Sequence, residues 1–172
     1  MEKREINPWT WQERFGFQQA TEVAQTTGEN IRVGKSTYLK APAGGKAGLY
    51  LYGITGKIGV IMAFTGNPSE DLIKQLGGHI AFARPLGLTR AEVPADLIAK
   101  EKVIAVEQAK ATGKPQQIAE KIAEGKMNSF YAERVLLDQE FFNAQVFKGS
   151  VGNYLKQSGV TLDKYARVEV GA

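Results

Sequence analysis

The stretch Gly113-Lys-Pro-Gln-Gln-Ile-Ala-Glu-Lys-Ile-Ala-Glu-Gly-Lys-Met127 reads as a short helix with a marked beginning. Gly113 interrupts the segment before it, and Pro115 suits the first turn of a helix, where its missing N–H has no partner to lose. Ile118 and Ile122 lie four residues apart, each followed by an alanine, which gives one narrow apolar stripe. A stripe this narrow predicts an antiparallel helical hairpin that meets a single partner helix.

The order of residues in this stretch is more specific than its periodicity, which alone would indicate an ordinary packing helix. Gly-Lys-Pro-x-x-Ile-Ala-Glu-Lys-Ile-x-Glu-Gly-x-Met resembles, in order and without a gap, the signature that opens the projecting coiled-coil hairpin of bacterial elongation factor Ts. The resemblance implies that this part of the chain, up to Tyr131, grips elongation factor Tu. The implied contact residues are Pro115, Ile118, Ile122, Met127 and Phe130.

Composition sets the outer limits. The 172 residues suit one domain, or one domain with an appendage, and the 43% hydrophobic content is enough for a core. No run approaches the roughly 18 apolar residues that cross a bilayer, and the charged first residues give no secretory signal. We therefore expect a cytoplasmic protein that does not contact a membrane.

The same composition excludes several kinds of site. The chain has no cysteine and one histidine, which excludes disulfides, thiolate metal sites and histidine-rich metal sites. The net charge of +4 is compatible with an acidic partner or RNA, but it is more typical of a solvated surface. We expect no metal, no cofactor and no direct contact with nucleic acid.

Residues 1–27 form an N-terminal aromatic segment that differs from the rest of the chain. It holds both tryptophans, Trp9 and Trp11, and Pro8 argues against a helix through it. The parity of the apolar residues predicts a strand from about Phe15 to Val23. The segment resembles the opening of Rid-type proteins, a family of trimeric imine deaminases, but the arginine-centred active-site region of that fold is not recognisable. Two other interpretations stay open: the aromatic residues pin the N-terminus to the domain surface, or they contact another protein.

From Gly28 the sequence is mostly β. Alternation over residues 29–40 predicts a half-buried strand, and further strands are expected at 48–52 and 58–64, joined by a hairpin at 54–57. A closing strand from Val160 to Val170 is expected to join the sheet begun at Ile31, which makes an antiparallel sheet of about four strands.

This region also resembles elongation factor Ts. Gly-Glu-Asn-Ile at residues 28–31, Tyr52-Gly53 and the run from Gly56 to Ile61 match that family's strand-and-hairpin pattern in order. Ala166 to Gly171 is similar to the ending of the family's sequences. The resemblance covers about residues 28–172.

The only histidine lies on a predicted helix. The turn at residues 66–71 begins this helix, and the helix runs to about Ala83, before Pro85. His79 lies at the edge of the apolar stripe, where a histidine is usually a packed, hydrogen-bonded core residue. His79-Ile80-Ala81 followed by Pro85 also resembles the Met-His-Ile-Ala-x-x-x-Pro end of this helix in elongation factor Ts. In that family the histidine lies at the surface that meets the GTPase domain of elongation factor Tu and helps to release GDP. The resemblance therefore implies that His79 and Ile80 bind the partner.

One departure from the family lies directly before this histidine. The family usually has Ala-Met there, whereas this chain has Gly77-Gly78. Two glycines within a helix cost roughly 2 kcal/mol relative to two alanines. Their presence also removes a packing side chain next to His79.

The predicted hairpin spans about residues 94–137. A long helix from about Pro94 to Ala111, preceded by a possible cap at Thr89, reverses at residues 112–114 into the helix quoted first. A short capped helix is expected at 150–158. The predicted fold is therefore α+β: an antiparallel sheet with helices on one side and a projecting helical hairpin.

The resemblance implies an elongation factor Ts-like protein that binds elongation factor Tu and promotes GDP/GTP exchange by contact, without being an enzyme. Two parts of the family have no counterpart in these 172 residues: an N-terminal three-helix module and a Thr-Asp-Phe-Val motif, since no Asp-Phe pair occurs. Weak exchange is therefore expected. The alternatives are an exchange-deficient scaffold or dimerisation module with the same fold, and a Rid-like imine deaminase. Self-association is left open.

Overall fold

The computed structural model describes residues 17–31, 34, 36–53, 56–111, 113 and 115–170. The chain divides into two compact units, Met1–Tyr38 and Leu39–Ala172, and each is described by itself. Within the described residues, no helix has an apolar stretch long enough to span a membrane. Several predicted features lie outside the described residues: Pro8, Trp9, Trp11, Phe15, the turn residues Ile54, Thr55, Thr112 and Lys114, and the terminal Gly171.

The described part of the first unit contains a helix, α2, from Phe17 to Thr27. The predicted strand ending at Val23 is therefore wrong over the described residues. Ala20 and Ala24 are half-buried and lie four residues apart, so the helical period describes the buried face better than strand parity does. Gln18 also donates to the Glu22 carboxylate at 3.3 Å, an i, i+4 pair that only a helix brings together.

Over the described residues the sheet has three strands, which is roughly consistent with the predicted number of about four. No strand is present among the described residues of the range 29–40, and the prediction of a strand there is wrong for them. Alternation predicts a strand only where one face has something to pack against. Asn30, Gly34 and residues 36–38 are all exposed, and only Ile31 and Leu39 among the described residues of this range are half-buried.

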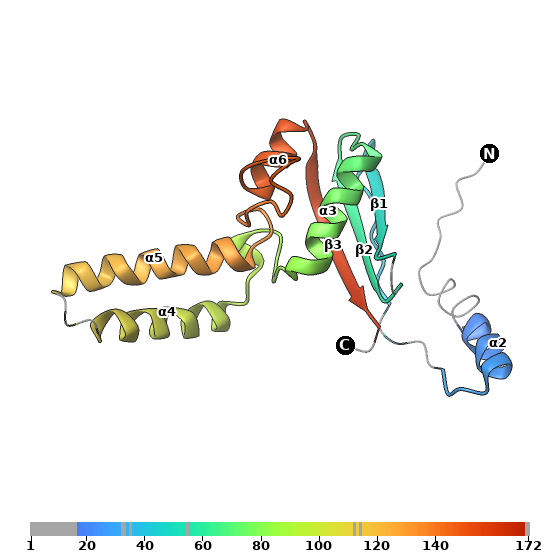
Figure 1. The fold of residues 1–172 in the computed structure, drawn as a ribbon, viewed down its shortest axis with the longest axis horizontal. Coiled ribbons are helices and arrows are strands. Elements are labelled where there is room, and N and C mark those ends of the chain that lie inside the picture. The colour runs from blue at the N-terminus through green and yellow to red at the C-terminus, as the bar shows by residue number, and fades with distance from the viewer. Residues whose placement is uncertain are drawn as a thin grey trace. The chain divides into compact units, whose positions relative to one another are not determined.

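The three strands are β1 (Lys46–Leu51), β2 (Ile58–Thr65) and β3 (Thr161–Glu169), in the antiparallel order β1-β2-β3 (Figure 1). The closing strand is confirmed, but its neighbour is β2 and not a strand at Ile31. The register of β2 against β3 shifts between Ala63 and Phe64, where β2 bends through an irregularity.

One face of the sheet packs against helix α3, from Glu70 to Ala83 (Figure 1). On β2, Val60, Met62 and Phe64 are fully buried and Ile58 is half-buried, and α3 contributes its own apolar stripe to the same core. The central members of this core are Val60, Met62, Phe64, Leu72, Leu76 and Ile80. Helix α6, from Val151 to Gln157, closes the core near β3 with Val151 and Leu155. The opposite face of the sheet carries exposed apolar side chains, among them Leu49 on β1 and Val168 on β3.

The predicted hairpin is confirmed as helices α4 (Ala95–Lys110) and α5 (Gln116–Arg134), which run side by side and extend away from the sheet (Figure 1). Thr89 precedes a short 3-10 helix, η2 (Arg90–Glu92), and its side chain caps neither η2 nor α4. The residues buried between α4 and α5 are small ones with a single methionine: Ala105, Ala109, Ala119, Ala123 and Met127. Alanine at these positions lets the two backbones approach closely. The narrow apolar stripe in the sequence therefore corresponds to close packing of α5 against a single helix, α4.

Candidate functional site

Helix α3 carries the first group of predicted site residues, and its sequence fixes both of its ends. The Ser69 hydroxyl accepts a hydrogen bond from the Leu72 N–H at 3.1 Å, and Glu70 and Asp71 place negative charge at the helix N-terminus. The helix ends at Arg84, whose φ of 49° lies in the left-handed region, just before Pro85. Arg84 is the only residue other than glycine with a positive φ among the described residues.

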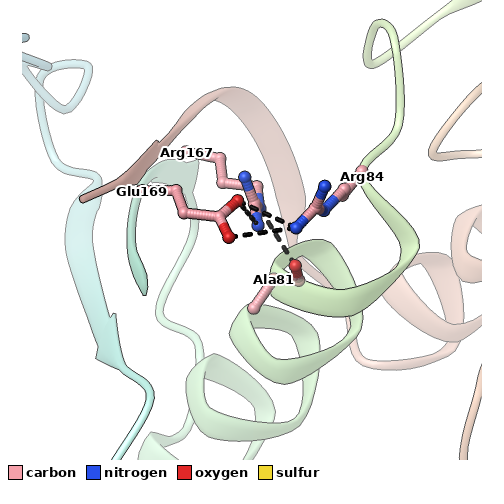
Figure 2. Close-up of polar contacts among 4 residues, drawn as sticks. All are labelled: Ala81, Arg84, Arg167 and Glu169. Carbon is pink, nitrogen blue, oxygen red and sulfur yellow. Dashed lines mark hydrogen bonds and ion pairs between the residues drawn. The ribbon is translucent and has the colours of Figure 1, made fainter. Parts of the chain in front are cut away.

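Strand β3 holds this end of α3 in place (Figure 2). Arg167 Nε donates to the Ala81 carbonyl at 2.9 Å, where a positive charge suits the helix C-terminus. Arg167 and Arg84 both bind the Glu169 carboxylate, at 2.7 and 3.0 Å. The hydrogen bond from Arg167 is the largest cause that lowers the pKa of Glu169 below its ordinary value.

Tyr165, two residues earlier on the same face of β3, adds a third contact. Its hydroxyl donates to the Pro85 carbonyl at 3.0 Å, and burial raises the pKa of Tyr165 to about 12. The face of β3 that carries Tyr165, Arg167 and Glu169 is thus the face that meets the end of α3. The position of the α3 C-terminus is therefore determined by the last strand of the chain.

His79 is buried, with 3% of its surface exposed. Its Nε2 lies 2.9 Å from Gln139 Oε1, and its Nδ1 accepts the Phe142 backbone N–H at 3.2 Å. The ring also stacks on Phe141, with centroids 5.7 Å apart. The packed, hydrogen-bonded interpretation of His79 is confirmed, and its role toward a partner stays a prediction.

These contacts define the protonation state of His79. Because Nδ1 faces an N–H donor, it must be the acceptor, and the proton of the neutral ring lies on Nε2 toward Gln139. Burial lowers the pKa of His79 below its ordinary value of 6.5, and the hydrogen bond to Gln139 opposes this shift without reversing it. A second proton would place two donors against each other at Phe142.

Gln139 is a member of this network that the sequence did not single out as a site residue. Its Nε2 donates to the Glu133 carbonyl at 2.7 Å, in the last turn of α5, while its Oε1 faces His79. Gln139 is itself buried. One side chain thereby connects α3 to the second helix of the hairpin. The sequence offers only its place two residues before Phe141. The burial of a lone glutamine depends on the tertiary fold, so the sequence alone does not predict it.

The paired glycines before His79 have different surroundings. A Cβ on Gly77 would lie 2.3 Å from Tyr50 Cβ, so the ring of Tyr50 fills the space that a side chain would need. A Cβ on Gly78 would lie 3.6 Å from Tyr50 Oη and 3.8 Å from both Phe142 Cζ and Tyr50 Cζ, which are ordinary contacts. Gly77 is therefore required by the approach of α3 to β1, whereas Gly78 is not.

Four aromatic side chains near this end of α3 are called the aromatic patch: Tyr50 and Phe142, which lie beside Gly78, together with Tyr52 and Phe82. Phe82 lies one turn after Gly78 and packs edge-on against Tyr52, with centroids 5.0 Å apart. Phe82 and Phe142 are 58% and 56% exposed, whereas the two tyrosines are half-buried. Phe142, with its ring centroid 5.9 Å from that of His79, brings this exposed surface close to the histidine.

The remaining predicted site residues lie on α5 or at its start. Pro115 is exposed at the N-cap of α5, and Ile118 is 45% exposed. Ile122 and Phe130 are half-buried against the alanines and the methionine that are buried between α4 and α5, a cluster that we call the alanine seam. Met127 is buried in that seam, as Ile80 is in the main core. A groove of about 310 Å³ lies between the two helices and is lined in part by Ile104, Phe130 and Arg134. The structure therefore places the predicted residues in two groups, at α3 and along the hairpin.

The hairpin is attached to the core next to the histidine network. The Leu86 N–H donates to the Arg134 carbonyl at 2.8 Å, and the Leu136 N–H donates to the Gly87 carbonyl at 3.0 Å. Arg90 forms an ion pair with Asp138 at 2.6 Å and lies over the ring of Tyr131.

Among the described residues, no three acidic or histidine side chains gather as a metal site would require.

Comparison with known proteins gives consistent results. The family model described as Elongation factor TS matches residues 6–172. Elongation factor Ts of Pasteurella multocida (strain Pm70) is 40% identical over 160 residues, which are 93% of this chain and 54% of that protein. Elongation factor Ts of Hydrogenobaculum sp. (strain Y04AAS1) is 38% identical over 144 residues, covering 84% and 50%. That of Saccharopolyspora erythraea is 38% identical over 158 residues, covering 86% and 57%.

The chain thus spans about half the length of the curated relatives that it matches. The family match also begins at residue 6, so it includes most of the N-terminal segment for which the sequence suggested a different resemblance.

Proposed function

The chain belongs to the elongation factor Ts family, and on that premise we propose that it binds elongation factor Tu and promotes the exchange of GDP for GTP. The observation that carries the proposal is the family match over nearly the whole chain, together with a hairpin and an α3 histidine where the family signatures predicted them. The protein would act by contact, with no chemical step, cofactor or metal of its own.

Two surfaces are proposed to meet the partner. One is the end of α3 around His79 and Ile80, and the other is the hairpin with Pro115, Ile118, Ile122, Met127 and Phe130. Since His79, Ile80 and Met127 are buried, they would act by shaping the surface above them, whereas Pro115 and Ile118 would touch the partner. The groove between α4 and α5 supports the hairpin as a contact site, because exposed Ile104 and half-buried Phe130 offer apolar area beside polar groups.

Exchange requires more than binding. A protein accelerates GDP release only if it binds the GDP-free form of its partner more tightly than the GDP-bound form. A rigid two-point contact serves this purpose, because it favours the one partner conformation that fits both points. Gln139 supports the rigidity, since it joins α3 to α5 through buried hydrogen bonds.

The experiment is the release rate of a fluorescent GDP analogue from bacterial elongation factor Tu, with and without the chain. Ile118→Asp is the hairpin variant, since it places a charge on an exposed apolar position without disturbing the alanine seam. Gln117→Asp, which adds the same single negative charge at an exposed position on the same helix, is the control for charge alone. We expect the wild-type chain to accelerate release and Ile118→Asp to lose most of that acceleration.

The second candidate is a scaffold with the same fold that binds without exchanging. It is favoured by the lack of an Asp-Phe pair in these 172 residues. Binding in a pull-down with no acceleration of GDP release would select this candidate, and the absence of both would contradict the family function for this chain. A cytoplasmic location and the absence of nucleic-acid binding are part of the leading proposal. Self-association stays a prediction that sedimentation velocity tests.

A further inference from the structure

His79 has no surface with which to make a partner contact. Both ring nitrogens are used within the chain, by Gln139 and by the Phe142 N–H, and one ring face is covered by Phe141. To reach another protein, the imidazole would have to break two buried hydrogen bonds, and each unsatisfied group left behind costs free energy. A direct contact by His79 is therefore disfavoured.

The side chain that reaches solvent beside His79 is Phe142. Its backbone N–H is the donor to His79 Nδ1, and its ring lies 5.9 Å from the imidazole, centroid to centroid. The hydrogen bond fixes the backbone at Phe142, and this in turn fixes the direction of a ring that is more than half exposed. The geometry makes His79 a support for Phe142.

The aromatic patch has the character of a protein contact. Tyr50 and Phe142 lie beside Gly78, and Phe82, one turn later on α3, packs against Tyr52. Large aromatic side chains that stay exposed together are uncommon on a protein surface without a partner. They are enriched at the centres of interfaces, where they supply much of the binding energy.

The patch is also connected to the hairpin surface. Gln139 bonds both His79 beneath the patch and the last turn of α5. A partner that lies along the hairpin toward its base therefore reaches the aromatic patch, because Gln139 ties the histidine behind that patch to α5. This continuity favours one partner that covers both surfaces over a separate ligand at each.

We infer that Phe82 and Phe142 form the contact with elongation factor Tu at this end of α3, and that His79 and Gln139 are positioning residues behind them. The inference rests on the proposed function. The matching surface on the partner is an apolar, uncharged depression that accepts two aromatic rings.

The test measures both the affinity for elongation factor Tu and the release rate of the fluorescent GDP analogue. The contact variants are Phe82→Ala and Phe142→Ala. The matched control is Leu49→Ala, which removes a similarly exposed apolar side chain from the opposite face of the sheet. We expect each phenylalanine variant to weaken binding about tenfold or more, as truncation of an interface anchor does, and Leu49→Ala to change it less than about twofold.

The positioning role is tested by combining variants. If His79 acts through Phe142, the loss caused by His79→Ala disappears in the Phe142→Ala background, because the two changes remove one interaction. His79→Asn should restore most of the affinity, since its carboxamide oxygen can accept the Phe142 N–H near the place of Nδ1. A merely structural role would lower the melting temperature of His79→Ala without this pattern of non-additivity.

The outcomes separate the two proposals. Binding by the wild-type chain that both phenylalanine variants retain would overturn this inference and leave the proposed function standing. Full additivity of His79→Ala and Phe142→Ala would overturn the positioning role of His79. Phenylalanine variants that alter only self-association, seen by sedimentation velocity without the partner, would assign the patch to a second copy and also overturn the inference. No binding by the wild-type chain would overturn the proposed function and this inference with it.

Discussion

The adjacent glycines of α3 make a sharp test of the packing between α3 and β1. Replacing either one by alanine adds a single methyl group within the same turn of the same helix. An alanine in a helix interior is favoured over glycine by about 1 kcal/mol, because glycine loses more backbone freedom on folding. Without any tertiary effect, both variants would therefore be stabilised by the same amount.

The surroundings of the two methyl groups are expected to give opposite signs. At Gly78 the nearest atoms lie at 3.6 and 3.8 Å, so the helix term remains and stability rises by about 1 kcal/mol. At Gly77 the methyl group would lie 2.3 Å from Tyr50 Cβ and 2.7 Å from Tyr50 Cγ. These atoms are at the root of the side chain and cannot rotate away. Overpacking of this kind costs typically about 1–3 kcal/mol, so after the helix gain of about 1 kcal/mol Gly77→Ala is expected to lose up to about 2 kcal/mol net.

Urea unfolding followed by far-UV circular dichroism measures both variants against the wild type. Gly125→Ala in α5 supplies the helix term alone, since its Cβ would meet nothing within 4 Å. The slope of the free energy of unfolding against urea must stay constant, because a change in slope would mean a change in the unfolding reaction itself. A Gly77→Ala protein as stable as Gly125→Ala, with the same slope, would refute the close approach of Tyr50 to α3.

Three further predictions concern other parts of the molecule. The lowered pKa of His79 means that the unfolded chain binds a proton there before the folded chain does, so stability is complete above pH 6.5 and falls as the pH is lowered toward the pKa of the folded state; His79→Gln should remove this part of the pH dependence in urea titrations. Ala109→Leu should destabilise the hairpin by about 1–3 kcal/mol through overpacking of the seam, whereas Ala99→Leu on the exposed face of α4 should be nearly neutral in thermal unfolding. Arg167→Met should lower the melting temperature more than Arg84→Ala, because Arg167 is largely buried and also bonds the end of α3, while Arg84 is mostly exposed; equal shifts would contradict this assignment.

The elements that the sequence predicted well are those with strong local signals. Helix α3 has a serine cap, acidic residues in its first turn and a proline just after its end, and its bounds follow from these. The hairpin follows from a narrow stripe on each side of a glycine turn, and Gly113 indeed has a φ of +68°. The closing strand follows from clear alternation between residues 161 and 169.

The errors arose where tertiary contacts decide. The segment from Phe17 to Thr27 fits both periods over a short window, and its glutamines, glutamate and alanines favour the helix. The range 29–40 alternates, but most of its described residues are exposed.

The candidate site shows the same division. Its positions on α3 and the hairpin were evident from the sequence, because the family signatures are local runs of residues. The burial of His79 and the role of Gln139 were not evident, since they depend on a contact between residues 60 positions apart. The exposure of Phe82 and Phe142 likewise depends on how three segments converge.

The attachment of the hairpin also determines how the chain can fold. Strands β2 and β3 pair although they lie about a hundred residues apart in sequence, and contacts of such high order normally slow folding. The hydrogen bonds from Leu86 to Arg134 and from Leu136 to Gly87 join the two ends of the hairpin, so once it has formed by local contacts its length no longer adds to the loop that β3 must close. The closed hairpin therefore reduces the effective length of chain between β2 and β3. Its length can change by whole helical turns during evolution with little effect on the entropy of closing the sheet.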